Sequence, residues 1–110
     1  MVVRPVAWVQ RVLDPDFRTV IPTPPFPEYT SGHSVQSAAA VQVLIAQLGD
    51  TLAFVDSSQV DVGQPPRPFA SFTAARDEVA WSRVYAGVHY LPAVIDGVTL
   101  IGQYKIVAIN

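Results

Sequence analysis

Apolar residues in the middle of this chain recur at the spacing of an α-helix. Residues 31–48 place alanine, valine, leucine and isoleucine around most of a helical wheel, and Gly49 follows as a typical helix end. A helix that is apolar on nearly every side is surrounded by other helices. The pattern therefore predicts a central helix of a bundle over these residues.

Three further segments combine a helical pattern with start or stop signals. They are residues 5–13, 72–87 and 92–109. Pro5 and Pro92 suit the first turn of a helix, and Ser71 is a typical N-cap. The expected packing positions of the last helix are Val94, Ile95, Val98, Ile101 and Ile106. We predict an all-α fold, a bundle of about four helices.

Polar and proline-rich segments connect these helices. The prolines of residues 14–29 predict an extended chain that lacks regular structure. Residues 49–71 predict a long loop, in which residues 51–55 fit either a short strand or a turn. We find neither an internal repeat nor a domain boundary, and interpret residues 1–110 as a single partial domain.

Composition adds that this domain is part of a larger core. Half of its 110 residues are hydrophobic and only 15% are charged. We therefore expect either a homo-oligomer or missing N-terminal helices to cover its surface. A net charge of −2 without a basic patch argues against nucleic-acid binding. Polar residues interrupt the most apolar segments, so we predict no membrane span; the sequence leaves the cellular location open.

The start of the helix at residues 31–48 is a candidate anion site. Helix starts expose unpaired N–H groups and positive potential, yet the first turn here carries no acidic residue. Gly32 also lets a ligand approach the backbone. The alternative is that Thr30 or Ser31 simply caps the helix while His33 packs against a neighbour.

Arg83 and His89 form a second candidate pair, because Gly87 ends the third helix and lets the chain turn between them. A guanidinium suits phosphate-like oxyanions, and a neutral imidazole is a nucleophile or a metal ligand. The alternative is a surface arginine and a histidine that caps backbone carbonyls. Arg4 and Pro5 alone carry little information.

Taken in order, these motifs resemble the signature of a known superfamily. Arg4-Pro5, Ser31-Gly32-His33, and Ser82-Arg83 followed by His89 are similar to the motifs shared by type 2 phosphatidic acid phosphatases (PAP2), bacterial acid phosphatases and vanadium-dependent haloperoxidases. The soluble bacterial haloperoxidase-like branch is the most similar. The resemblance covers residues 4 to about 102 and implies the C-terminal part of a larger helical bundle.

The resemblance also implies roles for the motif residues. Oxyanion binding falls to Arg4, Ser31, Gly32 and Arg83. His33 is then the acid/base, and His89 is the nucleophile or the residue bonded to vanadium as vanadate. With vanadate as cofactor, such a site supports peroxide-dependent halide oxidation. Without a cofactor it hydrolyses phosphate monoesters through a phosphohistidine. Either way the partners are small-molecule substrates.

The chain departs from the family pattern at three positions, of which Thr30, in place of the proline usual before Ser-Gly-His, is a mild change. The motif lysine seven residues before Arg4 falls ahead of Met1, so a truncated, inactive fragment is a third hypothesis. The aspartate usual four residues after the last histidine is Ala93, and Asp96 is the candidate for orienting His89, unless it is only an exposed acid. A metal site of both histidines and Asp96 is disfavoured, because the flanking arginines repel a bare cation.

Overall fold

The structure is a computed structural model that describes residues 3–103, with side chains described through residue 100. Its elements are, in order, α1 (Pro5–Val12), α2 (Gly32–Leu48), β1 (Phe54–Asp56), the 3-10 helix η1 (Val60–Val62), β2 (Arg67–Phe69), α3 (Phe72–Tyr85) and α4 (Leu91–Gln103). The four helices lie where the sequence predicts them, and the helical-bundle prediction is confirmed. The part of the last predicted helix beyond residue 103 lies outside the described residues.

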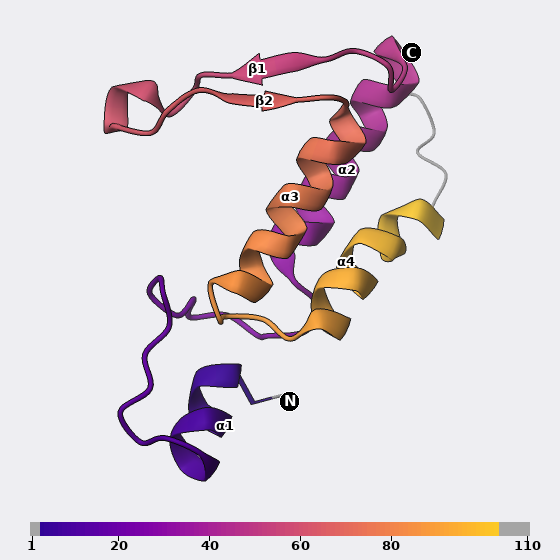
Figure 1. Cartoon of the computed structure of the whole chain (residues 1–110). Coiled ribbons are helices and arrows are strands. Elements are labelled where there is room, and N and C mark those ends of the chain that lie inside the picture. The colour runs from indigo at the N-terminus through magenta and orange to yellow at the C-terminus, as the bar shows by residue number, and fades with distance from the viewer. Residues whose placement is uncertain (1–2, 104–110) are drawn as a thin grey trace.

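Helices α2, α3 and α4 pack against one another and enclose a core of mostly small side chains (Figure 1). The buried apolar residues are Ala38, Val41, Phe72, Ala80, Ala86, Val88, Ala93 and Val94. Because alanine and valine dominate this set, the helix backbones lie close together. Of the expected packing positions on α4, Val94 is confirmed, whereas Ile95 is 49% exposed and that prediction is wrong.

Helix α4 packs tightly against the start of α2 at Gly97. A Cβ atom on Gly97 would lie 2.9 Å from the Cβ of Ser34 and 3.0 Å from the carbonyl oxygen of Ser31. The N–H of Ser31 also donates to the carbonyl of Ala93, at 3.1 Å. Together, the tight crossing and this hydrogen bond fix the start of α2 against α4.

Serine side chains cap two of the helices. The Ser31 hydroxyl accepts a hydrogen bond from the N–H of Ser34, and the Ser71 hydroxyl accepts one from Ala74. Each bond satisfies one of the N–H groups that a helix start leaves unpaired. The N-cap predicted at Ser71 is thereby confirmed, and Ser31 is the cap of α2.

Residues 49–71 hold a β-hairpin, so the expectation of a plain loop is wrong. β1 and β2 pair antiparallel, with Phe54 opposite Phe69, and the alternative of a short strand within residues 51–55 overlaps β1. The ring of Phe54 lies 5.4 Å from the rings of both Phe69 and Phe72. This aromatic cluster joins the hairpin to the start of α3, from which the hairpin extends sideways (Figure 1).

Helix α1 lies apart from the other helices (Figure 1), and none of its residues is buried. The predicted extended segment, residues 14–29, contains neither helix nor strand and leads from α1 to α2. Several large apolar side chains of α2 are exposed, among them Val43, Leu44 and Leu48. Within residues 3–103, no helix is long and apolar enough to cross a membrane.

Candidate functional site

Residues far apart in the sequence meet at the end of the bundle where α2 begins. Arg4 precedes α1, Arg83 lies in the last turn of α3, and His89 lies in the turn between α3 and α4. The charges of Arg4 and Arg83 both lower the pKa of His89, and that of Arg83 lowers the pKa of His33. The structure thus brings the two predicted arginines and the two predicted histidines into one electrostatic neighbourhood.

Arg4 links the N-terminal part of the chain to this site. Its Nη1 donates to the carbonyl of Val88 at 2.5 Å and lies 3.2 Å from Nε2 of His89. Its Nη2 donates to the carbonyl of Phe26 at 2.6 Å, and the guanidinium lies over the Phe26 ring. Its Nε is buried without a hydrogen-bond partner. Since α1 packs against no other helix, the Arg4 side chain is a main attachment of this end to the bundle.

His89 is only 2% exposed and lies between a cation and an anion. Nε2 faces Arg4, and Nδ1 lies 3.5 Å from Oε1 of Glu28. Burial lowers the pKa of His89 below its ordinary value, and Arg4 lowers it further, while Glu28 acts in the opposite direction. The ring is therefore neutral near pH 7 and retains a lone pair, as a nucleophile or a metal ligand requires.

Glu28 is the site residue that the sequence did not reveal. It is 3% exposed, and its Oε1 accepts a hydrogen bond from the N–H of Tyr90 at 2.8 Å. Asp96, the predicted partner of His89, is exposed and accepts a hydrogen bond from the hydroxyl of Tyr29 at 2.8 Å instead. The assignment of Asp96 to His89 is therefore wrong. The sequence shows an acidic residue in the proline-rich segment, two residues ahead of Thr30. It does not show that this residue is buried or that it contacts the turn between α3 and α4.

Arg83 is 8% exposed, and its Nε is also buried without a hydrogen-bond partner. Its pKa is lowered by burial and by the charge of Arg4. The guanidinium of Arg83 therefore lies in surroundings that already carry positive charge from Arg4. The neighbouring Ser82 faces elsewhere, since its hydroxyl donates to the carbonyl of Val79 within α3.

The first turn of α2 holds the remaining predicted site residues, Ser31, Gly32 and His33. Ser31 is fully buried, and although its hydroxyl oxygen accepts the capping bond, its hydrogen remains free to donate. Gly32 and His33 are exposed, and a Cβ on Gly32 would meet no atom within 4 Å. Partial removal of water from the His33 ring, and then the charge of Arg83, lower its pKa, which favours a neutral ring. Capping by Ser31 and anion binding at this turn are therefore compatible.

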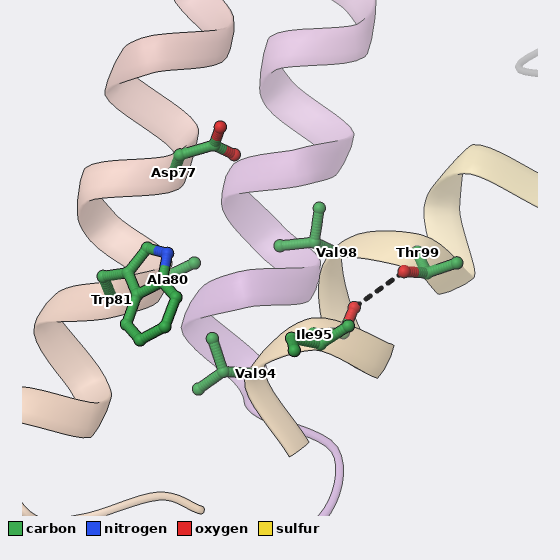
Figure 2. A pocket seen from close by; sticks show the side chains of 7 residues that line it. All are labelled: Asp77, Ala80, Trp81, Val94, Ile95, Val98 and Thr99. Atoms are coloured by element: carbon green, nitrogen blue, oxygen red, sulfur yellow. Dashed lines mark hydrogen bonds between the residues drawn. The ribbon is translucent and has the colours of Figure 1, made fainter. Parts of the chain in front are cut away.

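Two clefts in the described part of the structure differ in character from this site. A cleft of about 210 Å³ between α3 and α4 is lined mostly by apolar side chains and by Asp77 at its edge (Figure 2). A smaller one of about 190 Å³ contains Tyr29, Thr30 and Asp96. Neither has an arginine or histidine in its lining. Among the described residues, no group of three or more histidine, aspartate or glutamate side chains could hold a bare metal ion.

Comparison with known proteins gives this arrangement its context. The sequence profile described as "VCPO second helical-bundle domain" matches residues 4–105. The chain belongs to this domain family. The resemblance to vanadium-dependent haloperoxidases is thereby confirmed, and the four-helix architecture agrees with it.

A solved structure extends the comparison to three dimensions. A bacterial vanadium-dependent iodoperoxidase is 47% identical to this domain and superimposes on it with a TM-score of 0.86. The match covers 89% of this chain but 24% of the iodoperoxidase chain, so the domain spans about a quarter of that protein's length. No protein of curated function matches the sequence.

Proposed function

We propose that this domain supplies the oxyanion pocket of a vanadium-dependent haloperoxidase. The observation that carries the proposal is the pair of arginines, Arg4 and Arg83, each with a buried Nε that lacks a partner, next to the neutral ring of His89. Leaving such donors unpaired is costly in a folded protein, and a bound oxyanion would satisfy both.

The donor set fits vanadate, a tetrahedral oxyanion that also accepts a nitrogen ligand. Arg4, Arg83, the Ser31 hydroxyl and the N–H of Gly32 would bind its oxygens, and His89 Nε2 would be the nitrogen ligand. In the present arrangement Arg4 donates to that nitrogen, so binding requires Arg4 to turn its donor to the anion. When bound, vanadate activates peroxide for halide oxidation.

His33 has the properties of the acid/base group in this proposal. It is exposed at the start of α2, next to the backbone N–H of Gly32, and its lowered pKa leaves the ring able to accept a proton near neutral pH. The charge of Arg83 acts on this ring, which supports a role for His33 at the same anion. It would therefore exchange protons with the oxygens that the arginines hold.

A titration of the purified chain with orthovanadate tests the proposal, followed by an assay of peroxide-dependent iodide and bromide oxidation. We expect saturable vanadate binding that inorganic phosphate displaces. The Arg83→Lys variant should bind about 10- to 100-fold more weakly, because an ammonium cannot reproduce the paired donors of a guanidinium and the loss of one charge-assisted hydrogen bond costs about 1.5–3 kcal/mol. Arg11→Lys, at an exposed position of α1, is the matched control.

Two results would overturn the proposal. One is the absence of saturable binding in the folded wild-type chain. The other is equal vanadate affinity of the Arg83→Lys and Arg11→Lys variants. Hydrolysis of a chromogenic phosphate monoester without any vanadate-dependent oxidation would assign the same residues to a phosphatase instead.

A further inference from the structure

Glu28 places one buried carboxylate oxygen against two consecutive residues of the turn between α3 and α4. Its Oε1 accepts the N–H of Tyr90 at 2.8 Å and lies 3.5 Å from Nδ1 of His89. Within the described residues, Nδ1 has no aligned hydrogen-bond partner. Glu28 offers this edge of the ring both its backbone carbonyl and its carboxylate, and each opposes the lowering of the His89 pKa by burial and Arg4. The Tyr90 bond holds Oε1 of Glu28 near the imidazole.

The opposite edge of the imidazole points to the same protonation state. Nη1 of Arg4 lies 3.2 Å from Nε2, and a guanidinium only donates hydrogen bonds. Nε2 must then present its lone pair, which leaves the proton of the neutral ring on Nδ1. That proton faces Glu28. Contacts on the two edges of the ring, made by separate segments of the chain, thus select one tautomer.

Neighbouring groups explain how the fold tolerates the buried carboxylate of Glu28. Arg4 provides a compensating positive charge near Glu28: burial lowers the pKa of Arg4, and the charge of Glu28 opposes that lowering. Ala93, at the position where the family pattern has an aspartate, offers His89 no carboxylate, and Asp96 is occupied by Tyr29. A buried acid without a partner of this kind would be strongly disfavoured.

We propose that Glu28 is the positioning residue of His89. It holds the proton on Nδ1, fixes the ring plane and keeps the Nε2 lone pair directed toward the oxyanion pocket. The role in ligand binding rests on the proposed function, whereas the role in fixing the tautomer belongs to the chain itself. Carboxylates that orient a liganding histidine in this way typically change affinity or activity about 10- to 100-fold when removed.

The tautomer is measurable in the ligand-free chain by long-range ¹H–¹⁵N correlation spectra. The chain contains two histidines, so His33 serves as an internal reference in every spectrum. We expect the Nδ1–H pattern for His89 in the wild type. In Glu28→Gln, which keeps an acceptor for the Tyr90 N–H but removes the charge, we expect a shift toward the Nε2–H form.

The Asp96→Asn variant is the matched control, because it removes one carboxylate from the same end of the bundle and leaves Glu28 intact. It should retain the wild-type His89 pattern. Glu28→Asp, which keeps the carboxylate on a shorter side chain, should recover the Nδ1–H pattern at least in part. If Glu28→Gln fails to fold by circular dichroism, the wild-type spectrum decides, because an Nε2–H pattern for His89 there overturns the proposal.

A second measurement separates this inference from the proposed function. Orthovanadate affinity should fall about 10- to 100-fold in Glu28→Gln and stay at the wild-type value in Asp96→Asn. Should the wild type bind no vanadate, the proposed function fails, while the tautomer spectra still decide the role of Glu28. Should the wild type bind and Glu28→Gln match Asp96→Asn in both tautomer and affinity, the positioning role is refuted and the proposed function stands.

Discussion

At the scale of single residues, Gly97 sets how closely α4 approaches the anion-binding turn. Gly97→Ala would bring a methyl group within 2.9 Å of Ser34 and within 3.0 Å of the Ser31 carbonyl oxygen. Overpacking of this kind typically costs about 1–3 kcal/mol. We expect a net loss of unfolding free energy in urea titrations, even though alanine favours helix by up to about 1 kcal/mol.

Gly32→Ala is the control for this prediction, because a Cβ on Gly32 meets no atom within 4 Å. The Gly32→Ala chain should be at least as stable as the wild type. Equal stability of the two alanine variants would show that the crossing at Gly97 relaxes without cost.

The residues with distinctive chemistry could be predicted from the sequence, and their partners could not. Arginine, histidine and a helix start with no acid occur at a recognisable spacing, which pointed to Arg83, His89 and Ser31. The acid beside His89 could not be predicted, because Glu28 reaches the α3–α4 turn only through the path of the extended segment. Asp96 was the nearer acid in sequence, but the helix directs it to Tyr29.

At the scale of elements, Ser31 and Ser71 make the same capping bond at the starts of α2 and α3. Replacing either serine with alanine should lower the unfolding free energy by about 0.5–2 kcal/mol. Only Ser31→Ala should also weaken orthovanadate binding, because only this hydroxyl belongs to the proposed pocket. Urea titration and vanadate titration of both variants check the two halves of the prediction.

The comparison is informative because both variants lose the same capping hydroxyl, whereas only one of them lies in the proposed pocket. An equal loss of vanadate affinity in Ser31→Ala and Ser71→Ala would mean that the loss reflects stability alone. Unchanged affinity in both would remove Ser31 from the pocket.

Asp50 connects the base of the hairpin to the start of α3. Its carboxylate accepts the N–H of Thr73 at 3.0 Å and also the Thr73 hydroxyl. These hydrogen bonds, the side-chain one foremost, hold the pKa of Asp50 below its ordinary value of 3.8. Because the folded pKa is lowered, the stabilisation is complete above pH 3.8 and is lost as pH falls through the folded value.

We therefore expect Asp50→Asn to lower the thermal midpoint at pH 5 to 7 and the difference from the wild type to shrink in more acidic solution. Thermal melts across this range test the prediction. The charge-matched control is Asp61→Asn, at an exposed position of η1 between the two strands. A difference that stays constant down to the most acidic melts would exclude a role for the Asp50 charge.

Helices were easier to predict than the hairpin, for a physical reason. Each helix carries its own periodic pattern and start signal, such as Ser71 for α3. The strands are three residues each, and the pairing of Phe54 with Phe69 joins positions separated by a proline-rich turn. Such a pairing depends on the aromatic contact with Phe72, which no local pattern reveals.

At the scale of the whole molecule, the fold buries only some of the apolar side chains that the sequence provides. Helix α2 was predicted to lie at the centre of a bundle, and α3 and α4 do cover one side of it. On its other side large apolar side chains remain exposed, with Leu48 at 60%. The related iodoperoxidase chain is about four times as long as the matched region, so its corresponding helix has further polypeptide available for contact.

The exposed face of α2 should make this chain associate on its own. Contiguous apolar surface is normally covered by protein, so we expect sedimentation velocity to show self-association that increases with concentration. Leu44→Lys and Leu48→Lys, both on α2 and away from the start of that helix, should shift the chain toward the monomer and leave vanadate affinity unchanged. Gln47→Lys adds the same charge at an exposed polar position and should associate like the wild type. A wild-type chain that stays monomeric at every concentration would show that this face needs no cover, and that the core formed by α2, α3 and α4 suffices.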